Sequence, residues 1–509
     1  MADDDRPVLI GAGMLTLREA GEVARSPQDL MADAARNALA DAGGHIGAKA
    51  IDSIIAIRTF ADSAPQFASP FGGARNYPRA VARRIGAEPG FTAYPAVGGN
   101  SPQAMVTLLA ERIARGKSKV ALLVGGEAIR SMQLLMRSGA QADWNEEDPP
   151  PHLSPGDARP GMTPLEMRHG IASPADVYPL FESALAARYD RDMEAQRDHI
   201  AQLFARFSKI AAAHPHAALP VERAAPAIRD PGPDNRMIAW PYTKYMNANM
   251  FVDQAAAVLM TSVGVARRAG IGPDAMVHLA GAADLDEKWY LGERVAYDSS
   301  PAIRLGAKAA LGRARIGVEE LDFIDLYSCF PSAVEVAADA LGLAHDDPRG
   351  LTVTGGLPFF GGAGNAYSLF AIAEIFARLR AKGRGHGLVT ANGWYLTKHS
   401  FGVYAAGPPR RDFMRGEDAP LQARIDAMPS PPRDESPEGA CTVEAATVSF
   451  SRNGPERAIV IGRLDTGARF FANGQPGDAA LMDALMGPRP IGMKLIVASE
   501  KGKGVVRLP

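Results

Sequence analysis

This chain of 509 residues repeats one order of predicted elements in its two halves. Ser26–Pro27 is typical of a helix start, because serine caps the first turn and proline suits the first helical position. The helix is followed by a predicted strand over 51–57. Ser300–Pro301 opens a similar helix, and a predicted strand over 321–327 follows it. The repeat indicates an internal duplication, in which strands alternate with helices and form largely parallel sheets with helices on both faces.

The remaining elements extend this α/β pattern. Apolar periodicity and glycine or proline boundaries predict further strands over 7–13, 119–124 and 387–390, and further helices over 102–115, 331–341 and 366–379. Residues 146–160 are polar and rich in proline, which is typical of a loop, whereas 178–213 has the apolar faces of a helical region. We interpret the stretch that contains both as a cap inserted into the first half.

The composition changes after Gly407. A charged, proline-rich stretch is typical of a linker, and the short β-type runs that follow, separated by turn residues, predict a small β-barrel-like domain. The predicted domains are an N-terminal half at 1–128 and 236–272, a cap at 129–235, a C-terminal half at 273–407, a linker at 408–440 and an additional β domain at 441–509.

Composition argues against several classes of partner. A net charge of −2 provides no electrostatic attraction for nucleic acid or for an anionic membrane. No apolar stretch approaches the ~20 residues that a transmembrane helix needs. The acidic start, with Asp3–Asp5, is unlike a secretory signal, and Cys329 and Cys441 provide no disulfide framework. We therefore expect a cytoplasmic protein without a membrane span.

Six short motifs follow one another along the chain. They are Val8–Met14 (VLIGAGM), Gly98–Ala104 (GGNSPQA), Ala121–Glu127 (ALLVGGE), Tyr327–Phe330 (YSCF), Gly355–Gly362 (GGLPFFGG) and Thr390–Gly393 (TANG). In this order and spacing they resemble the thiolase superfamily, closest to its sterol-carrier-protein-type and thiolase-like branch, over residues 5–407. With the added β domain, the whole chain resembles thiolase-like proteins of type 1. The resemblance implies a five-layered thiolase fold, made of two duplicated α/β halves, and a homodimer.

The resemblance also implies a reaction centre, but the reacting groups are replaced in this chain. In thiolases a cysteine at a helix N-terminus is held as thiolate and takes the acyl group, while a histidine, an asparagine-held water and a second cysteine assist. The corresponding positions here are Gly99, Tyr327, Gly362 and Asn392. No cysteine precedes Cys329, and the loss of one oxyanion donor alone costs ~3 kcal/mol of transition-state stabilisation. Acyl transfer through a cysteine is therefore not expected.

Two side chains near this centre are candidates for other chemistry. Tyr327 would transfer a proton, as cleft tyrosines of thiolase-fold aldolases do, or would only line the cleft. His399 would act as a general base, or would be a surface or capping histidine. Candidate substrate contacts are Asn100, Ser101, Asn247, Asn249 and Phe330. Asn100 and Ser101 have an alternative role as helix caps.

No metal site and no cofactor are expected. His214 and His216 lie in a loop without a carboxylate or cysteine at metal-binding spacing. Gly11–Gly13 lacks the third glycine and the acidic partner of a dinucleotide-binding fingerprint. The coenzyme A moiety would be bound only as part of a ligand.

Three functions remain open. The leading interpretation is a protein that binds acyl-CoA or a related acyl thioester without acyl-cysteine catalysis, as a carrier, a sensor or a non-catalytic subunit in lipid metabolism. A second is a lyase that cleaves a β-hydroxyacyl-CoA by a retro-aldol reaction with Tyr327 and His399. A third is an interaction module that docks a protein partner through the C-terminal domain. An assignment as acyltransferase would rest on the fold alone, which does not establish function.

Overall fold

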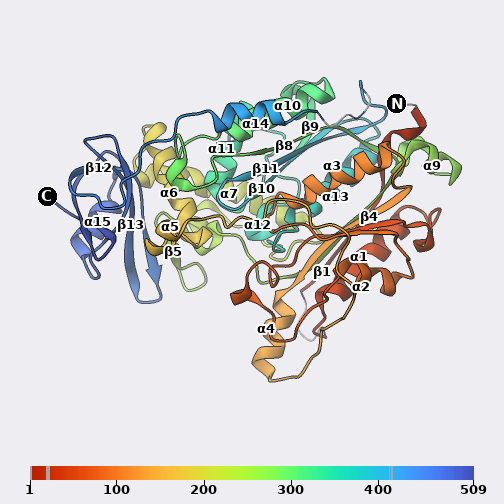
Figure 1. The fold of residues 1–509 in the computed structure, drawn as a ribbon, viewed down its shortest axis with the longest axis horizontal. Helices are drawn as coiled ribbons and strands as arrows, with labels where there is room; N and C mark the ends of the chain where they lie inside the picture. Colours follow the sequence, from red (N-terminus) through yellow and green to blue (C-terminus); the bar gives the residue numbers. More distant parts are fainter. Residues whose placement is uncertain (1–2, 19–22, 412, 414–415) are drawn as a thin grey trace.

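The computed structural model describes residues 3–18, 23–411, 413 and 416–509. Residues 1–2 and 19–22 of the predicted N-terminal half, and 412 and 414–415 of the predicted linker, lie outside the described residues. Most of the chain forms two α/β halves, and a smaller β domain lies at one end of the molecule, where the chain ends (Figure 1). No helix among the described residues has both the length and the apolar character that crossing a membrane requires.

One mixed sheet of nine strands runs through both halves, in the order β3–β2–β4–β7–β1–β8–β11–β10–β9. Its strands are β1 (Pro7–Leu17), β2 (Ser53–Ala56), β3 (Phe91–Ala93), β4 (Val120–Ala128), β7 (Asp253–Ser262), β8 (Val277–Asp286), β9 (Leu321–Asp325), β10 (Gly385–Gly393) and β11 (Lys398–Ala406). The halves meet where Val8 and Leu9 of β1 pair with His278 and Val277 of β8.

The two halves have the same strand pairing, which confirms the predicted duplication. In the first half β1 is antiparallel to β7, β7 is antiparallel to β4, and β4 is parallel to β2. In the second half β8 is antiparallel to β11, β11 is antiparallel to β10, and β10 is parallel to β9. The expectation of largely parallel sheets is therefore wrong. Between β10 and β11 the reason is local, because only Trp394–Thr397 connects them, and strands joined by so short a turn run antiparallel.

Helices cover the part of the sheet that belongs to each half, and two helices also lie between the halves. α1 (Pro27–Asp41) packs on β1, β4 and β7, and α10 (Pro301–Ala314) packs on β8 and β11. Between the halves, α3 (Ser101–Ala114) and α13 (Tyr367–Lys382) contact each other and strands of both halves. This arrangement has the five layers of the predicted fold. The other helices of the two halves are α2 (Tyr77–Ile85), α9 (Val263–Arg268), α11 (Pro331–Leu341) and α12 (Gly356–Phe359).

Both predicted Ser-Pro helix starts are present. Ser26 and Ser300 each accept a hydrogen bond from the backbone N–H three residues further along, and a proline occupies the first turn. The strand that packs on each helix carries a glycine at the contact, Gly11 in β1 and Gly281 in β8. A Cβ at these glycines would lie 2.3 Å and 2.2 Å, respectively, from a carbonyl oxygen of the helix. Only glycine permits this close approach, and it occurs in both halves.

The cap contains two long helices where the sequence predicted one helical region over 178–213. These are α6 (Pro174–Arg188) and α7 (Met193–Ala213). The chain breaks between them because Asp190 has a left-handed backbone conformation (φ 54°) and Asp192 caps the start of α7. The shorter cap helices are α4 (Ile129–Ser138), α5 (Pro164–Arg168) and α8 (Ala225–Arg229).

The C-terminal residues form a closed five-stranded β-barrel, which confirms the predicted β-barrel-like domain. In pairing order its strands are β12 (Gly439–Ser451), β13 (Gly454–Leu464), β14 (Arg469–Gly474), β16 (Lys503–Arg507) and β15 (Lys494–Glu500), and β15 pairs with β12 to close the barrel. The sequence pattern did not indicate β16 or the short helix α15 (Ala479–Leu485).

Parts of the chain outside the barrel strands attach the barrel to the core. The short strands β5 (Met237–Ala239) and β6 (Tyr242–Thr243) extend the barrel sheet beyond β12. They come from the stretch predicted to return to the N-terminal half. In the stretch predicted as linker, α14 (Ala419–Asp426) packs on α10 and β8. α6 of the cap packs directly on β12.

Arg469 of β14 connects the barrel to the second half through a buried guanidinium group. Its side chain has no exposed surface, and it pairs with Glu444 at 2.5 Å. The same guanidinium donates to the carbonyl oxygens of Gly292, at 3.2 Å, and Arg294, at 2.5 Å. Arg463 pairs with the same carboxylate at 2.8 Å, but 35% of its side chain is exposed. The two arginines therefore differ mainly in burial and in their contacts with the core.

We expect the Arg469→Ala variant to lose ~3–5 kcal/mol of free energy of unfolding, because it leaves buried hydrogen-bonding partners uncompensated. Arg463→Ala is the matched control and should lose less than ~1 kcal/mol, since exposed ion pairs contribute little. Urea titrations followed by circular dichroism measure both values. Equal losses in the two variants would contradict the anchoring role of Arg469.

Candidate functional site

The position that corresponds to the thiolase nucleophile has no room for a side chain. Gly99 immediately precedes the N-terminal end of α3. A Cβ at Gly99 would lie 2.2 Å from Oη of Tyr327 and 2.5 Å from the carbonyl oxygen of Asn392. Non-bonded atoms do not approach so closely without a shift of the structure. Gly99, Tyr327 and Asn392, which the family resemblance assigns to one reaction centre, therefore lie together, and the tyrosine hydroxyl occupies the space that a side chain at Gly99 would need.

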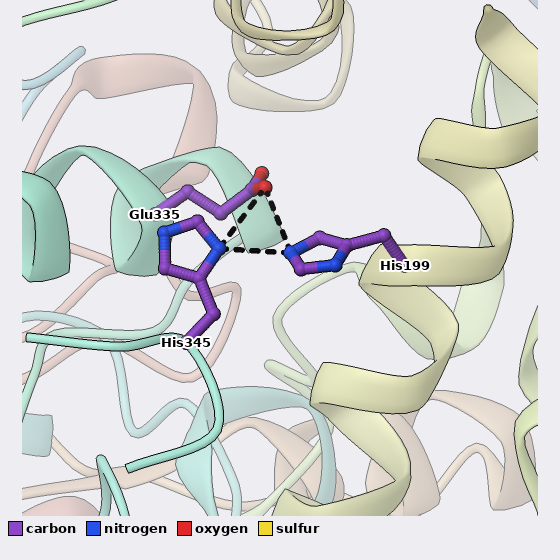
Figure 2. Close-up of side chains that lie close together, drawn as sticks. All are labelled: His199, Glu335 and His345. Atoms are coloured by element: carbon purple, nitrogen blue, oxygen red, sulfur yellow. Dashed lines mark hydrogen bonds and ion pairs between the residues drawn. The ribbon is translucent and has the colours of Figure 1, made fainter. Parts of the chain in front are cut away.

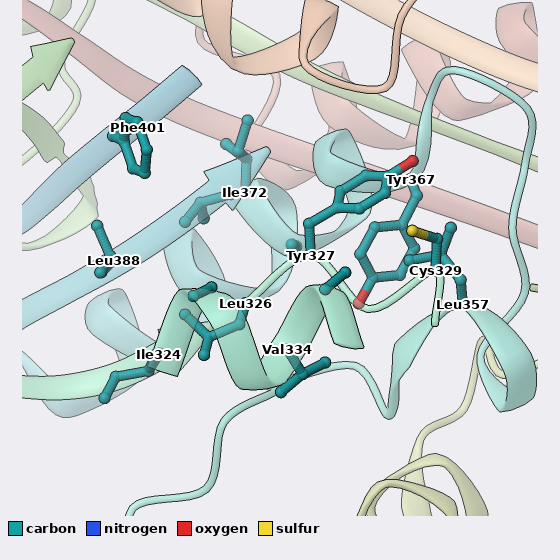
Figure 3. Packing of buried hydrophobic residues seen from close by; sticks show 14 of the residues in the cluster. Ile324, Leu326, Tyr327, Cys329, Val334, Leu357, Tyr367, Ile372, Leu388 and Phe401 are labelled. Carbon is teal, nitrogen blue, oxygen red and sulfur yellow. The ribbon is translucent and has the colours of Figure 1, made fainter. Parts of the chain in front are cut away.

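Tyr327 is held in this place by the core of the second half. Its backbone N–H donates to Oγ1 of Thr390 at 2.9 Å, and its ring packs edge-on against Tyr367 (Figure 3). Burial raises the pKa of the Tyr327 hydroxyl above its ordinary value, so the group is a neutral phenol. Burial also raises the pKa of Cys329 to about 12, which keeps that thiol protonated. Neither group is a ready nucleophile at neutral pH.

His399 is buried, which excludes the surface position that the sequence left open as one alternative to a general base. It stands opposite Asn392 in the β10–β11 hairpin, and strand residues that pair in this way have side chains on the same face. Burial lowers the pKa of His399 to about 3, so its ring is neutral at physiological pH. Tyr327, Asn392 and His399 line one cavity of about 10 Å³, which is close to the smallest space that holds a water molecule.

Asn100 and Ser101 do not cap α3 with their side chains. Nδ2 of Asn100 lies 3.5 Å from Oγ of Ser400, and Oδ1 has no hydrogen-bond partner. Oγ of Ser101 donates to the carbonyl oxygen of Ala96 at 3.1 Å. The sequence patterns did not single out Lys398. Its Nζ donates to the carbonyl oxygen of residue 97, in the loop that leads into α3. Burial lowers the pKa of Lys398 to about 8.

Gly362 and the two candidate asparagines lie in a second group. The backbone N–H of Gly362 donates to the carbonyl oxygen of Asn249 at 2.8 Å. A Cβ at Gly362 would have its nearest neighbours at 3.4 Å, so a small side chain fits there, unlike at Gly99. Oδ1 of Asn249 accepts from the backbone of Phe251, and Nδ2 of Asn247 donates to the carbonyl oxygen of Thr243. Each asparagine thus stabilises its own turn.

A tyrosine of the cap joins the residues around Gly99, which include Tyr327 and Asn392. Oη of Tyr178, in α6, accepts from Nδ2 of Asn392 at 2.7 Å and donates to the carbonyl oxygen of Trp394 at 2.9 Å. The Tyr178 ring stacks on Phe330 with centroids 4.4 Å apart, and Phe330 also stacks on Tyr242. Sequence reasoning missed Tyr178, and no local signal identifies it, because it lies 214 residues from Asn392.

Three polar atoms near Gly99 are buried without a hydrogen-bond partner. They are Oδ1 of Asn100, Oδ1 of Asn392 and Nε2 of His399. Most buried polar groups have a partner, and an unsatisfied one costs ~1–3 kcal/mol. All three are acceptors here, since the other histidine nitrogen is used by a hydrogen bond to the backbone of Leu396. Water or a ligand with N–H or O–H groups would satisfy them.

Two duplicated α/β halves around a central pair of helices define a thiolase-type fold. The structure is similar to that of a monomeric SCP2-thiolase like protein type 1 from Mycobacterium smegmatis, with 36% identity, coverage of 100% of each chain and a TM-score of 0.84. Residues 420–502 match the family described as thiolase-like protein type 1 additional C-terminal domain. The chain therefore belongs to the SCP2-thiolase-like proteins of type 1.

Two further solved structures share the fold at low identity. One, named Ltp2-ChsH2(DUF35) aldolase, is 18% identical and covers 80% of this chain and 99% of its own, with a TM-score of 0.60. The other, an acetyl-CoA acetyltransferase from Syntrophomonas wolfei, is 15% identical and covers 79% of this chain and 99% of its own, with a TM-score of 0.55. The comparison with curated proteins gives no match. The homodimer and the cytoplasmic location stay predictions.

The crowding at Gly99 can be measured by adding a single methyl group. We expect Gly99→Ala to lower the free energy of unfolding by ~1–3 kcal/mol, because the new Cβ meets Oη of Tyr327 and a backbone oxygen. Gly362→Ala is the matched control and should change stability by less than ~1 kcal/mol, since the space there is sufficient. Urea titration compares the two variants.

A double-mutant cycle then tests whether Tyr327 is the cause. Gly99→Ala should cost less in a Tyr327→Ala background than in the wild type, because the hydroxyl that blocks the new methyl group is absent. A cost that is unchanged by Tyr327→Ala would mean that the tyrosine does not fill the nucleophile position.

Proposed function

We propose that this protein binds a coenzyme A ester, or a related acyl thioester, without forming an acyl-cysteine. The observation that carries the proposal is that Oη of Tyr327 occupies the space that a side chain at Gly99 would need, while buried acceptor atoms of Asn100, Asn392 and His399 have no partner. The fold belongs to a family built around thioester chemistry, which supports the class of ligand. The replaced groups support binding in place of acyl transfer.

The polarity of the three unpartnered atoms agrees with this proposal. Hydrogen-bond acceptors suit the amide N–H groups of a pantetheine arm, because each N–H needs an acceptor when it leaves water. The same acceptors would not stabilise the oxyanion of a reacting thioester, which requires donors. Unpartnered acceptors at Oδ1 of Asn100, Oδ1 of Asn392 and Nε2 of His399 would therefore favour the bound ground state over the transition state of acyl transfer.

Isothermal titration calorimetry with acyl-CoAs of increasing chain length tests this function. We expect a Kd below 1 mM, so the standard free energy of binding should be more favourable than about −4 kcal/mol. The Kd should change little with acyl length, because Tyr327 closes the approach to Gly99, and it should become length-dependent in Tyr327→Ala. No binding at millimolar ligand would exclude the proposal.

Asn100→Ala should weaken acyl-CoA binding about tenfold, or ~1.4 kcal/mol, by removing one acceptor. Asn453→Ala is the matched control, since Asn453 is an exposed asparagine of the barrel, and its Kd should equal that of the wild type. Equal affinities of the two variants would place the ligand away from Asn100.

A second candidate function is retro-aldol cleavage of a β-hydroxyacyl-CoA. The position of Tyr327 supports it, since its hydroxyl lies beside Gly99, which the family resemblance assigns to the nucleophile. In this reaction a base takes the β-hydroxyl proton, the Cα–Cβ bond breaks, a carbonyl forms at Cβ, and the acyl-CoA enolate takes a proton. A neutral Tyr327 suits the last step as the proton donor.

We expect Tyr327→Phe to abolish such a cleavage while leaving acyl-CoA binding intact, because the variant removes only the hydroxyl. A coupled assay for the released carbonyl product measures turnover, and calorimetry measures binding. Equal turnover in wild type and variant would exclude Tyr327 as the acid. If the wild type cleaves no substrate, the lyase function is excluded and only the proposed binding function remains.

A further inference from the structure

Two histidines and a glutamate converge beside the cap, away from the thiolase position. His199 comes from α7, Glu335 from α11 and His345 from the loop after α11, and their side chains point at one another (Figure 2). Nε2 of His199 lies 2.8 Å from Nδ1 of His345 and 3.5 Å from Oε1 of Glu335. Nδ1 of His345 lies 3.7 Å from the same carboxylate oxygen. Three potential metal-ligand atoms thus face a common point.

The size of this triangle fits a zinc ion. A triangle with sides of 2.8, 3.5 and 3.7 Å contains a point about 2 Å from all three atoms, and zinc bonds to histidine nitrogen and carboxylate oxygen are ~2.0–2.2 Å long. Two imidazole nitrogens and one carboxylate oxygen are also a donor set that zinc prefers. The ligands need no large movement to close around the ion.

Neighbouring side chains orient the ligand atoms in the way known for metal centres. Nε2 of His345 lies 3.0 Å from Oδ1 of Asp339, so a proton on Nε2 directs the lone pair of Nδ1 at the common point. Asp339 is held in turn by the hydroxyl of Tyr189 at 2.5 Å. Nε2 of Gln196 donates to Oε1 of Glu335 at 3.0 Å.

The charge of the cluster also favours a cation. The Glu335 side chain has no exposed surface and is hydrogen-bonded to the buried side chain of Glu182, while its ion-pair partners among the described residues are the two histidines. A buried carboxylate is costly unless it is paired or bound to a metal. A divalent ion between the three side chains would supply the positive charge.

One side of the cluster is open. A cavity of about 310 Å³ is lined by both histidines together with Arg191, Gln202, Leu203, Arg206 and Asp346. A quarter of the His199 side chain is exposed. Three protein ligands beside an accessible cavity leave a fourth position for water or for one oxygen of a small anion, which is the arrangement of zinc sites that are not purely structural.

We propose that His199, His345 and Glu335 bind one zinc ion, with a fourth position that faces the cavity beside Arg191 and Arg206. The sequence led us to expect no metal site, because it drew attention to His214 and His216, which are near each other in the chain. His199 is 146 residues from His345 and 136 residues from Glu335, across the α7–α11 contact, and the three ligands share no motif. The site is independent of coenzyme A binding at Gly99.

The proposal is tested on the full chain, freed of metal by dialysis against a chelator. Titration with Zn²⁺ against a chromogenic chelator should show one equivalent bound tightly. His199→Ala and His345→Ala should each weaken binding by more than the ~10–100-fold that is typical of second-shell changes. His216→Ala is the matched control, a histidine that lies outside the cluster, and it should bind zinc as the wild type does.

Asp339→Asn separates a positioning role from simple packing. It should retain one equivalent of zinc but weaken binding ~10–100-fold, because the His345 ring is no longer oriented by a carboxylate. Asp346→Asn, at the exposed edge of the cavity, should have no effect. Far-ultraviolet circular dichroism confirms that each variant is folded.

Two outcomes would overturn the proposal. If the wild type binds no stoichiometric zinc, the cluster holds a shared proton, with Nε2 of His199 donating to Nδ1 of His345. If zinc binds equally well to His199→Ala and His345→Ala, the ion lies elsewhere. In a zinc-soaked crystal of the wild type, an anomalous signal between the three side chains would support the site directly.

Discussion

The packing of α13 against the start of α3 holds the candidate site in place. The carbonyl oxygen of Gly99 accepts from Oγ of Ser368 at 2.9 Å, and the backbone N–H of Gly98 donates to Oδ1 of Asn365 at 3.0 Å. These side chains belong to the second half, whereas the glycines belong to the first. The loop that would carry a thiolase nucleophile is thus positioned by the other half, and its conformation depends on the interface between them.

The replaced residues at this site form one consistent structure. The glycine at 99 and the tyrosine at 327 require each other, because any larger residue at 99 would meet the tyrosine hydroxyl. Burial keeps Tyr327 and His399 neutral, since it raises the pKa of Tyr327 and lowers that of His399. Such a site suits hydrogen bonding to a neutral ligand better than the transfer of charge.

The cap has three roles in this architecture. Through α6 it places Tyr178 against Asn392 and Phe330, and it also carries the barrel, whose Ala446 N–H donates to Ser183 of the same helix at 3.1 Å. Through α7 it brings His199 to α11 and its following loop. The inserted segment therefore links the thiolase position, the added domain and the proposed zinc site.

Local patterns in the sequence determined the duplication, both Ser-Pro helix starts, the positions of most core strands and the absence of a cysteine before residue 329. The helix starts and strands follow from backbone propensity and apolar periodicity, which act over a few residues, whereas the absence of a cysteine is read directly from the sequence. Local patterns did not reveal the antiparallel course of β7 and β11, the break before α7, or the extension of the barrel sheet by β5 and β6.

The tertiary structure decided which side chains meet. Tyr178 reaches Asn392, and His199 reaches His345, across separations of 214 and 146 residues, and no spacing rule connects such pairs. The sequence alone identified which reacting groups were missing. Only the folded chain decided that Tyr327 fills the vacated space and that three distant ligand atoms converge, because both depend on how helices pack against sheets.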